Sequence, residues 1–380
     1  MISAAPIAEL PYLVVNHKET LTPSMAPNVT SMPTEPDFVI SSSLYASYGA
    51  YVVLVLIFGL SQNLLTLYVF YSDRRLHSMH NYFIVGLSLA DIGMCVFGNW
   101  MIIASSFSQH WVFGRTGCVF YGFATTWFGI SQISLLAAIA IDRYVIIVKP
   151  RGIVMTKQKA FILVICCFGH GFVWALLPAI GWNSYSLEGI GVRCAINWRS
   201  HVTSDITYSM AILICGWICP LSLILFSYRN IFITLQCKRT RILEQSSLKG
   251  RTNRQRNDRK MAVTVLCMIC AFFISWTPYA IVTLCSAFGN FRKLPVVVTV
   301  LPALFAKSSI IWNPIIYVAR NTLFRRALFQ KVPFLHNLHR TLSNSSKQTV
   351  MKTSEVSVNE IRDKTYFQSS AEKASVGTYL

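Results

Sequence analysis

The chain has 380 residues, of which 53% are hydrophobic and only 13% are charged. This composition excludes an ordinary soluble domain and indicates a protein that lies within a lipid bilayer. The formal net charge of +19 is typical of a cytoplasmic surface that faces anionic lipid and an acidic protein partner, so we expect no nucleic acid partner.

Residues 1–45 form a mixed, proline-containing segment ahead of the first long apolar stretch. It lacks a basic start followed by an apolar core, so we expect no cleavable signal peptide. Asn28 begins an Asn-Val-Thr glycosylation sequon, which can be modified only if this segment is extracellular. Sequons also arise by chance, and the alternative is an unmodified Asn28.

Seven apolar stretches are long enough to cross a membrane as helices, because one crossing takes roughly 20 residues. Polar or turn-forming residues separate these stretches. The predicted spans are 46–71, 81–105, 116–141, 160–181, 207–231, 260–286 and 296–318. The pattern predicts an all-α membrane protein, a seven-transmembrane-helix bundle over residues 46–318.

The distribution of Lys and Arg predicts the orientation of the bundle. Most of them fall in segments that share one side of the membrane with the C-terminus, so the N-terminus is expected outside and the C-terminus in the cytoplasm. Residues 319–332 mix Leu, Phe and Ala with Arg325 and Arg326, which indicates a short amphipathic eighth helix on the inner membrane surface. Residues 333–380 predict a disordered cytoplasmic tail, either unmodified or phosphorylated on its serines.

Three polar residues lie inside predicted spans, where a polar side chain is costly and is therefore a functional candidate. They are Asn63 in the first span, Asp91 in the second and Asn313 in the seventh. Together they predict an interior polar network. The alternative, for the two asparagines, is a contact that only holds helices together.

The third span ends in Asp142-Arg143-Tyr144. The arginine there can be held by Asp142 or by a second acid on a nearby helix, and Asp258 at the start of the sixth span is in position to be that acid. Breaking such a pair when helices separate would act as a switch.

The seventh span carries an Asn-Pro-Ile-Ile-Tyr motif from Asn313 and Pro314 to Tyr317. Together with Asp-Arg-Tyr, a Trp-Thr-Pro-Tyr motif at 276–279 and a proline at 220, it resembles the rhodopsin-like G-protein-coupled receptors over residues 45 to 330. The resemblance implies a ligand pocket in the outer half and a heterotrimeric G protein docking inside, with arrestin and a receptor kinase as further partners. It also implies a disulfide between Cys118 and Cys194, both on the oxidising outer face.

Lys307 lies well inside the seventh span, whereas a lysine that reaches the membrane surface would lie at a helix end. Burial favours the neutral amine, the form that attacks an aldehyde to make a Schiff base. At this spacing before Asn313, Lys307 resembles the retinal-linking lysine of the opsins. The alternative is a structural lysine held in a salt bridge.

A protonated Schiff base is a buried cation and needs a compensating negative charge. Where vertebrate visual opsins carry a carboxylate, this chain has Tyr121. The loop around Glu188 resembles the opsin loop that covers the chromophore, so we expect Glu188 to be the counterion, Tyr121 to be its hydrogen-bonding neighbour, and Asp91 to be the less favoured substitute. The resemblance also assigns pocket-lining positions to Gly129, Trp217, Trp276 and Tyr279.

Further stretches, including 194–199 and 304–309, are similar to the peropsins, a group of retinal-photoisomerase-like opsins. The resemblance implies retinal, all-trans or 11-cis, as cofactor and a plasma or photoreceptor membrane as location. It implies a light-activated receptor that signals through a G protein, with a light-driven all-trans to 11-cis photoisomerase as the alternative. A microbial-type retinal pump would need proton-relay carboxylates in the third span, where none lies between Cys118 and Asp142.

Overall fold

A computed structural model describes the chain from residue 40 to residue 332, with three short gaps. Asn28 and the tail 333–380 lie outside the described residues. The expectations of glycosylation at Asn28 and of a disordered tail therefore stay predictions. The described ranges are 40–150, 155–244, 249–288 and 296–332.

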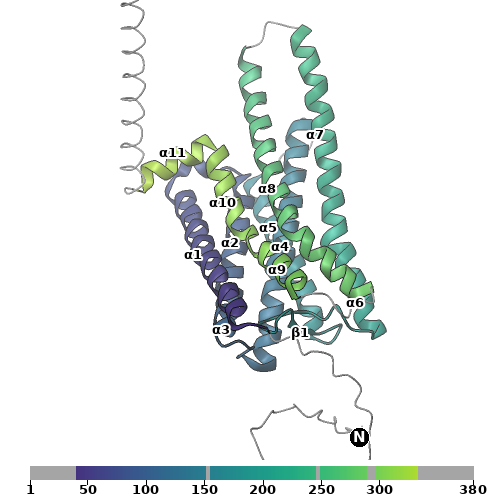
Figure 1. Ribbon diagram of the computed structural model, residues 1–380. Helices are drawn as coiled ribbons and strands as arrows, with labels where there is room; N and C mark the ends of the chain where they lie inside the picture. Colours follow the sequence, from purple (N-terminus) through teal and green to yellow (C-terminus); the bar gives the residue numbers. More distant parts are fainter. Residues whose placement is uncertain (1–39, 151–154, 245–248, 289–295, 333–380) are drawn as a thin grey trace, which may run out of the picture. The chain divides into compact units, whose positions relative to one another are not determined.

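Seven segments in these ranges are long and apolar enough to cross a membrane, as the sequence predicted. Three of them are interrupted: π-helical turns divide the second and fifth, and a break at Ser308 divides the seventh (Figure 1). The elements in chain order are α1 (Ser42–Ser72), α2 (Asn81–Met94), η2 (Cys95–Asn99), α3 (Trp100–Phe107), α4 (Gly114–Val148), α5 (Lys157–Ala179), α6 (Thr203–Leu213), η3 (Ile214–Ile218), α7 (Cys219–Glu244), α8 (Lys249–Phe288), α9 (Val296–Lys307) and α10 (Ser309–Arg320).

The helices are longer than the apolar stretches that predicted them. The third spanning helix continues to Val148 rather than to residue 141, and the fifth span continues to Cys237 rather than to residue 231. Asp142 directly follows the third apolar stretch and Arg229 lies near the end of the fifth, but a charge does not interrupt backbone hydrogen bonding. The helices therefore extend past the region that hydropathy detects.

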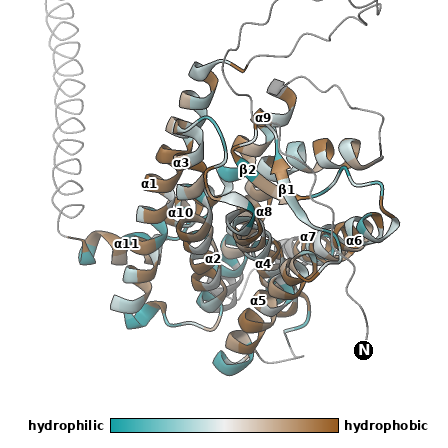
Figure 2. Cartoon of the chain, turned by 90° about the horizontal axis from the view of Figure 1, so that it is seen from below, coloured by the Kyte–Doolittle hydropathy of each residue, from teal (hydrophilic) through white to brown (hydrophobic). Residues whose placement is uncertain are grey.

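Helix α4 lies at the centre of the bundle, in contact with α2, α5, α7 and α8. Its inward side chains, among them Ile133, Leu135 and Leu136, are fully buried. Large apolar side chains remain exposed on the outer helix faces, for example Ile57 in α1 and Ile165 in α5, and hydrophobic colour covers much of the helices (Figure 2). Lipid, rather than water, is the solvent that suits such a surface.

A two-stranded antiparallel hairpin, which the sequence analysis did not predict, joins α5 to α6. Strand β1 (Tyr185–Glu188) pairs with β2 (Arg193–Ile196), and the register sets Glu188 directly opposite Arg193. Gly189 and Gly191 turn the chain with φ of +67° and +76°, a backbone region that glycine adopts without strain. The Tyr185 hydroxyl donates to the Ala175 carbonyl at 2.8 Å and so ties the hairpin to α5.

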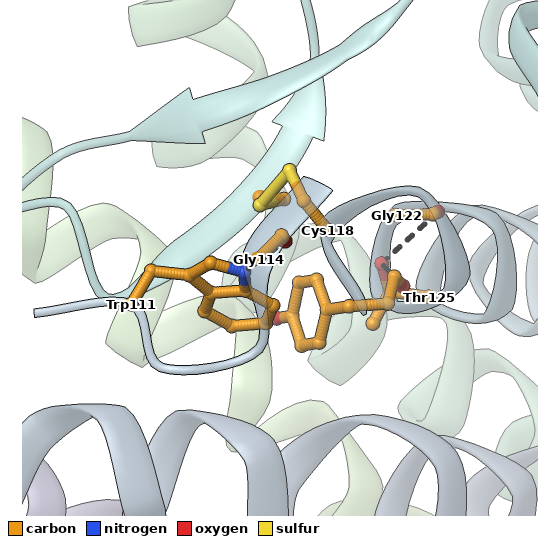
Figure 3. The surroundings of a disulfide bond; sticks show 7 residues. Trp111, Gly114, Cys118, Gly122 and Thr125 are labelled. Carbon is orange, nitrogen blue, oxygen red and sulfur yellow. Dashed lines mark hydrogen bonds between the residues drawn. A yellow bond between two sulfur atoms is a disulfide. The ribbon is translucent and has the colours of Figure 1, made fainter. Parts of the chain in front are cut away.

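The predicted disulfide is present and ties the same hairpin to α4. Cys118 in the first turns of α4 is bonded to Cys194 in β2, with the two Cα atoms 5.4 Å apart. About two turns further along α4, the Thr125 hydroxyl donates to the Gly122 carbonyl at 3.3 Å (Figure 3). The disulfide therefore fixes β2 to the beginning of the central helix α4. We refer to this end of the bundle below as the hairpin end.

Loss of this bond should destabilise the protein substantially. Removing a native disulfide typically costs about 2–5 kcal/mol, so we expect Cys194→Ser to lower the melting temperature of the purified protein in detergent. Cys166→Ser, which removes an exposed unpaired thiol from α5, is the matched control and should melt like the wild type. Equal melting temperatures for the three proteins under oxidising conditions would contradict this expectation.

A short eighth helix follows the seventh span, as predicted, over α11 (Thr322–Lys331). The Asn321 side chain caps it by accepting a hydrogen bond from the Phe324 backbone amide at 3.0 Å. Phe324 is buried against the rings of Phe70 and Tyr317, at centroid distances of 5.2 and 5.0 Å. This apolar contact holds α11 against the ends of α1 and α10, referred to below as the α11 end of the bundle.

Candidate functional site

A cavity of about 190 Å³ lies inside the helix bundle below the hairpin. A single water needs roughly 10–15 Å³ on this measure, so the cavity takes a ligand many times larger. Its walls are mainly apolar and aromatic. Six of the residues that the sequence analysis selected as chromophore-site candidates line it: Tyr121, Gly129, Trp217, Trp276, Tyr279 and Lys307.

Lys307 enters this cavity from a break in the seventh span. Helix α9 ends at Lys307, and the Ser308 amide donates to the Phe305 carbonyl at 3.1 Å instead of continuing the α-helical pattern. The Leu304 carbonyl then accepts a hydrogen bond at 3.2 Å from the Tyr51 hydroxyl of α1. Pro302 and Pro314, one on each side, cannot donate backbone hydrogen bonds and favour such an interruption.

The amine of Lys307 has an apolar and aromatic surrounding. The residue is 9% exposed, and Nζ lies 5.6 Å from the centroid of the Tyr121 ring. Among the described residues, Nζ makes no hydrogen bond or ion pair. Trp276, on the cavity wall, is anchored by a hydrogen bond from Nε1 to the Ser309 hydroxyl at 3.0 Å and stacks on Phe272.

Glu188 lies at the hairpin end and is already paired. Its Oε2 atom lies 3.0 Å from Nη2 of Arg193, and the Tyr279 hydroxyl donates to the same oxygen at 3.1 Å. The Arg193 guanidinium also lies over the Tyr279 ring, 5.4 Å from its centroid. The predicted hydrogen bond between Tyr121 and Glu188 is not among the contacts of the described residues, and Tyr121 packs edge-on against Trp111 instead.

Arg193 is a site residue that the sequence analysis missed. It lines the cavity and is 8% exposed. Burial alone would lower the pKa of its guanidinium, but the negative charge of Glu188 together with the neighbouring tyrosines outweighs this effect, and the pKa of Arg193 is raised above its ordinary value. The sequence could have indicated Arg193 through its neighbour Cys194, because the predicted disulfide places that segment over the pocket.

The interior polar residues fall into two groups. Asp91 accepts hydrogen bonds from Nε2 of Gln132 at 2.6 Å and from Nδ2 of Asn313 at 3.3 Å. Asn63 donates instead to the Ile310 carbonyl of α10 at 3.1 Å. Gln132, which the sequence analysis did not select, thus joins Asp91 and Asn313.

At the α11 end, Arg143 donates to the neighbouring carboxylate of Asp142. His80 approaches the same carboxylate, with its Nδ1 atom 2.9 Å from Oδ2. Asp258 forms no ion pair with Arg143 within the described ranges. His80, absent from the sequence analysis, is therefore the second partner of Asp142.

The two remaining motif residues at this end pack against neighbouring helices. The Tyr144 ring lies 5.5 Å from that of Phe226. The Tyr317 hydroxyl donates to Oδ1 of Asn81 at 3.0 Å. The Tyr317 bond links the end of α10 to the start of α2.

Comparison with known proteins agrees with this geometry. Residues 62–317 match the family described as 7 transmembrane receptor (rhodopsin family). The human visual pigment-like receptor peropsin is 32% identical over 84% of this chain and 93% of its own length. The G0-coupled rhodopsin of Mizuhopecten yessoensis is 33% identical over 77% of this chain and 73% of its own length. The crystal structure of squid rhodopsin superposes with a TM-score of 0.73 at 28% identity, covering 81% of this chain and 92% of the squid chain.

The chain therefore belongs to the rhodopsin family of seven-transmembrane receptors and is an integral, multi-pass membrane protein. Within this family it is an opsin, similar to peropsin.

Proposed function

We propose that this opsin senses light through retinal linked to Lys307 and signals through a heterotrimeric G protein. The proposal rests on the buried amine of Lys307, which lies in the wall of an apolar, aromatic cavity. This amine forms no ion pair among the described residues. Retinal supplies light absorption and photoisomerisation when it is bound. Either isomer, all-trans or 11-cis, is compatible with the proposal.

The residues of the cavity suit an elongated apolar aldehyde. The neutral amine of Lys307 would attack the aldehyde carbon, a C=N bond would replace the C=O bond, and the carbonyl oxygen would leave as water. Trp276 and Trp217 offer aromatic faces to a polyene. Gly129 lines the same cavity, and a Cβ added there would meet Trp276 at the ordinary contact distance of 3.7 Å.

Glu188 is the proposed counterion for the resulting linkage whenever that linkage is protonated. Tyr279 supports this role, because it lines the cavity and its hydroxyl donates to both oxygens of the Glu188 carboxylate, at 3.1 and 3.3 Å. The hydroxyl thus connects the carboxylate with the cavity. Asp91 lacks such a connection, because its carboxylate is bound by Gln132 and Asn313, which are not among the described residues that line the cavity.

Signalling would use the α11 end of the bundle as the cytoplasmic face. The Asp142–Arg143 pair and Pro314 inside α10 support this assignment. Helix separation can open the pair, and the proline removes one backbone hydrogen bond from the helix. The name of the G0-coupled rhodopsin relative also supports a G-protein partner. We place residues 1–45 outside the cell and the tail 333–380 inside it, where arrestin and a receptor kinase would act.

The test is light-driven nucleotide exchange on purified G proteins, with the receptor loaded separately with 11-cis- and all-trans-retinal. We expect light to raise the exchange rate several-fold. Arg143→Met should load with retinal and respond to light spectrally as the wild type does, yet lose the exchange. A light-induced change of isomer content without exchange on any G protein would favour the alternative, a retinal photoisomerase.

A further inference from the structure

The wall of the retinal cavity carries more positive than negative charge in the described residues. Lys307 and Arg193 both line it, whereas Glu188 is connected to it through Arg193 and Tyr279. Arg193 forms an ion pair with Glu188. If the linkage on Lys307 were protonated, the Lys307, Arg193 and Glu188 side chains together would therefore carry one net positive charge.

The other groups around Lys307 do not correct this balance. Asp91, deeper in the bundle, accepts hydrogen bonds from Gln132 and Asn313 and makes no ion pair with Lys307. The remaining polar neighbours are neutral at pH 7. They are Tyr51 of α1, Cys95 of η2, Tyr121 of α4, Tyr279 of α8, and Ser308 and Ser309 of the seventh span.

Arg193 is held in place and cannot easily leave its position. It is 8% exposed, its guanidinium lies over the Tyr279 ring, and its neighbour Cys194 is bonded to α4. The antiparallel register keeps it opposite Glu188.

We infer that Arg193 neutralises Glu188 and so keeps the retinal linkage on Lys307 unprotonated at neutral pH, which makes this opsin a near-ultraviolet pigment. The inference rests on the proposed function. An unprotonated imine of retinal absorbs at shorter wavelength than its protonated form, so the absorption band reports the state directly. Arg193 is thus a positioning residue that sets the spectral range through Glu188.

The experiment is an absorption spectrum of the full-length protein, loaded with retinal in the dark and titrated with acid. The wild type should absorb in the near ultraviolet at pH 7 and convert to a visible band on acidification. Arg193→Gln should absorb in the visible at pH 7, with the midpoint of conversion raised by about 1–3 pH units, the range expected for an unopposed carboxylate near the cation. Arg193→Lys, which keeps the charge, should remain in the near ultraviolet.

A second substitution checks that the effect passes through Glu188. In the double variant Arg193→Gln with Glu188→Gln, the visible band should be lost again at pH 7. A merely structural role of Arg193 would lower the melting temperature without moving the midpoint of conversion.

Two outcomes would overturn the inference. One is a visible band in the wild type at pH 7 that Arg193→Gln does not move. The other is a visible wild-type band that requires chloride and disappears in gluconate, because a bound anion would then supply the missing charge. If the variants fail to fold, a visible wild-type band at pH 7, with or without a chloride requirement, already overturns the inference.

Failure of the proposed function gives a different result. Acid denaturation converts any lysine-linked retinal to the protonated, visible form, whatever its state in the native pocket. Without such a band after denaturation, the protein does not link retinal, and both proposals fail together. With it, only the spectrum of the native protein decides the inference about Arg193.

Discussion

Lys307→Met should abolish every absorption band of lysine-linked retinal, in the native protein and after acid denaturation. Of the described residues that line the cavity, only Lys307 carries an amine, so no neighbour can replace it. Methionine keeps much of the side-chain volume and removes the nucleophile. Borohydride reduction of the wild type followed by peptide mass spectrometry should locate retinal on Lys307, and a retinyl group on another lysine would refute the assignment.

The same variant distinguishes a ligand-binding lysine from a structural one without any retinal. A buried amine that lacks a partner costs free energy in the folded protein, so Lys307→Met should raise the melting temperature of the retinal-free protein. A structural lysine held in a salt bridge would behave in the opposite way, because its loss would leave an unpaired acid in the interior. Lys260→Met, at an exposed position of α8, is the control and should change little.

The seven spans and the eighth helix could be predicted because each depends on local composition. A spanning helix needs a long apolar stretch, and α11 needs an apolar face beside Arg325 and Arg326. The ends of the spans were less predictable. Asp142 belongs to a helix that runs to Val148, and hydropathy carries no information on where hydrogen bonding stops.

The hairpin could not be predicted from pattern. Its strands have four residues each, too short for an alternation of polar and apolar residues to stand out. The pairing of Glu188 with Arg193 depends on the strand register. Without that register, Glu188 could be identified as an acid over the pocket, but its partner could not.

The site residues that sequence reasoning missed differ in the signal they offered. Gln132 is a polar residue inside the third span, and the rule that selected Asp91 applies to it as well. His80 lies just before α2, outside any apolar stretch, so no rule selects it. The choice between Asp142 and Asp258 as partner of Arg143 depends on the distance between α4 and α8. The sequence of either helix alone does not reveal that distance.

Gly171→Ala should destabilise the bundle strongly, because two helices touch at this position. A Cβ on Gly171 of α5 would lie 2.4 Å from the Trp127 carbonyl oxygen and 3.0 Å from the Ser131 amide of α4. These are backbone atoms of the central helix and cannot move aside as a side chain can. Close approach at small residues is how membrane helices pack.

To accommodate the methyl group, α5 must move away from α4. That movement would stretch the hydrogen bond from Trp127 Nε1 to the Phe168 carbonyl, now 2.9 Å long. It would also separate Gly171 of α5 from Ser131 of α4. Overpacking of this kind costs about 1–3 kcal/mol. We therefore expect Gly171→Ala to lower the melting temperature in detergent by several degrees.

The control lies two residues away on the same helix. A Cβ on Gly169 would meet nothing within 4 Å, and alanine is more favourable than glycine inside a helix by about 1 kcal/mol. Gly169→Ala should therefore melt at or slightly above the wild-type temperature. If the two variants shifted the melting temperature equally, the effect would come from glycine in α5 generally, and the close contact between α4 and α5 at Gly171 would be refuted. A large loss confined to Gly171→Ala would instead show that backbone contact, rather than interlocking side chains, sets the distance between these two helices.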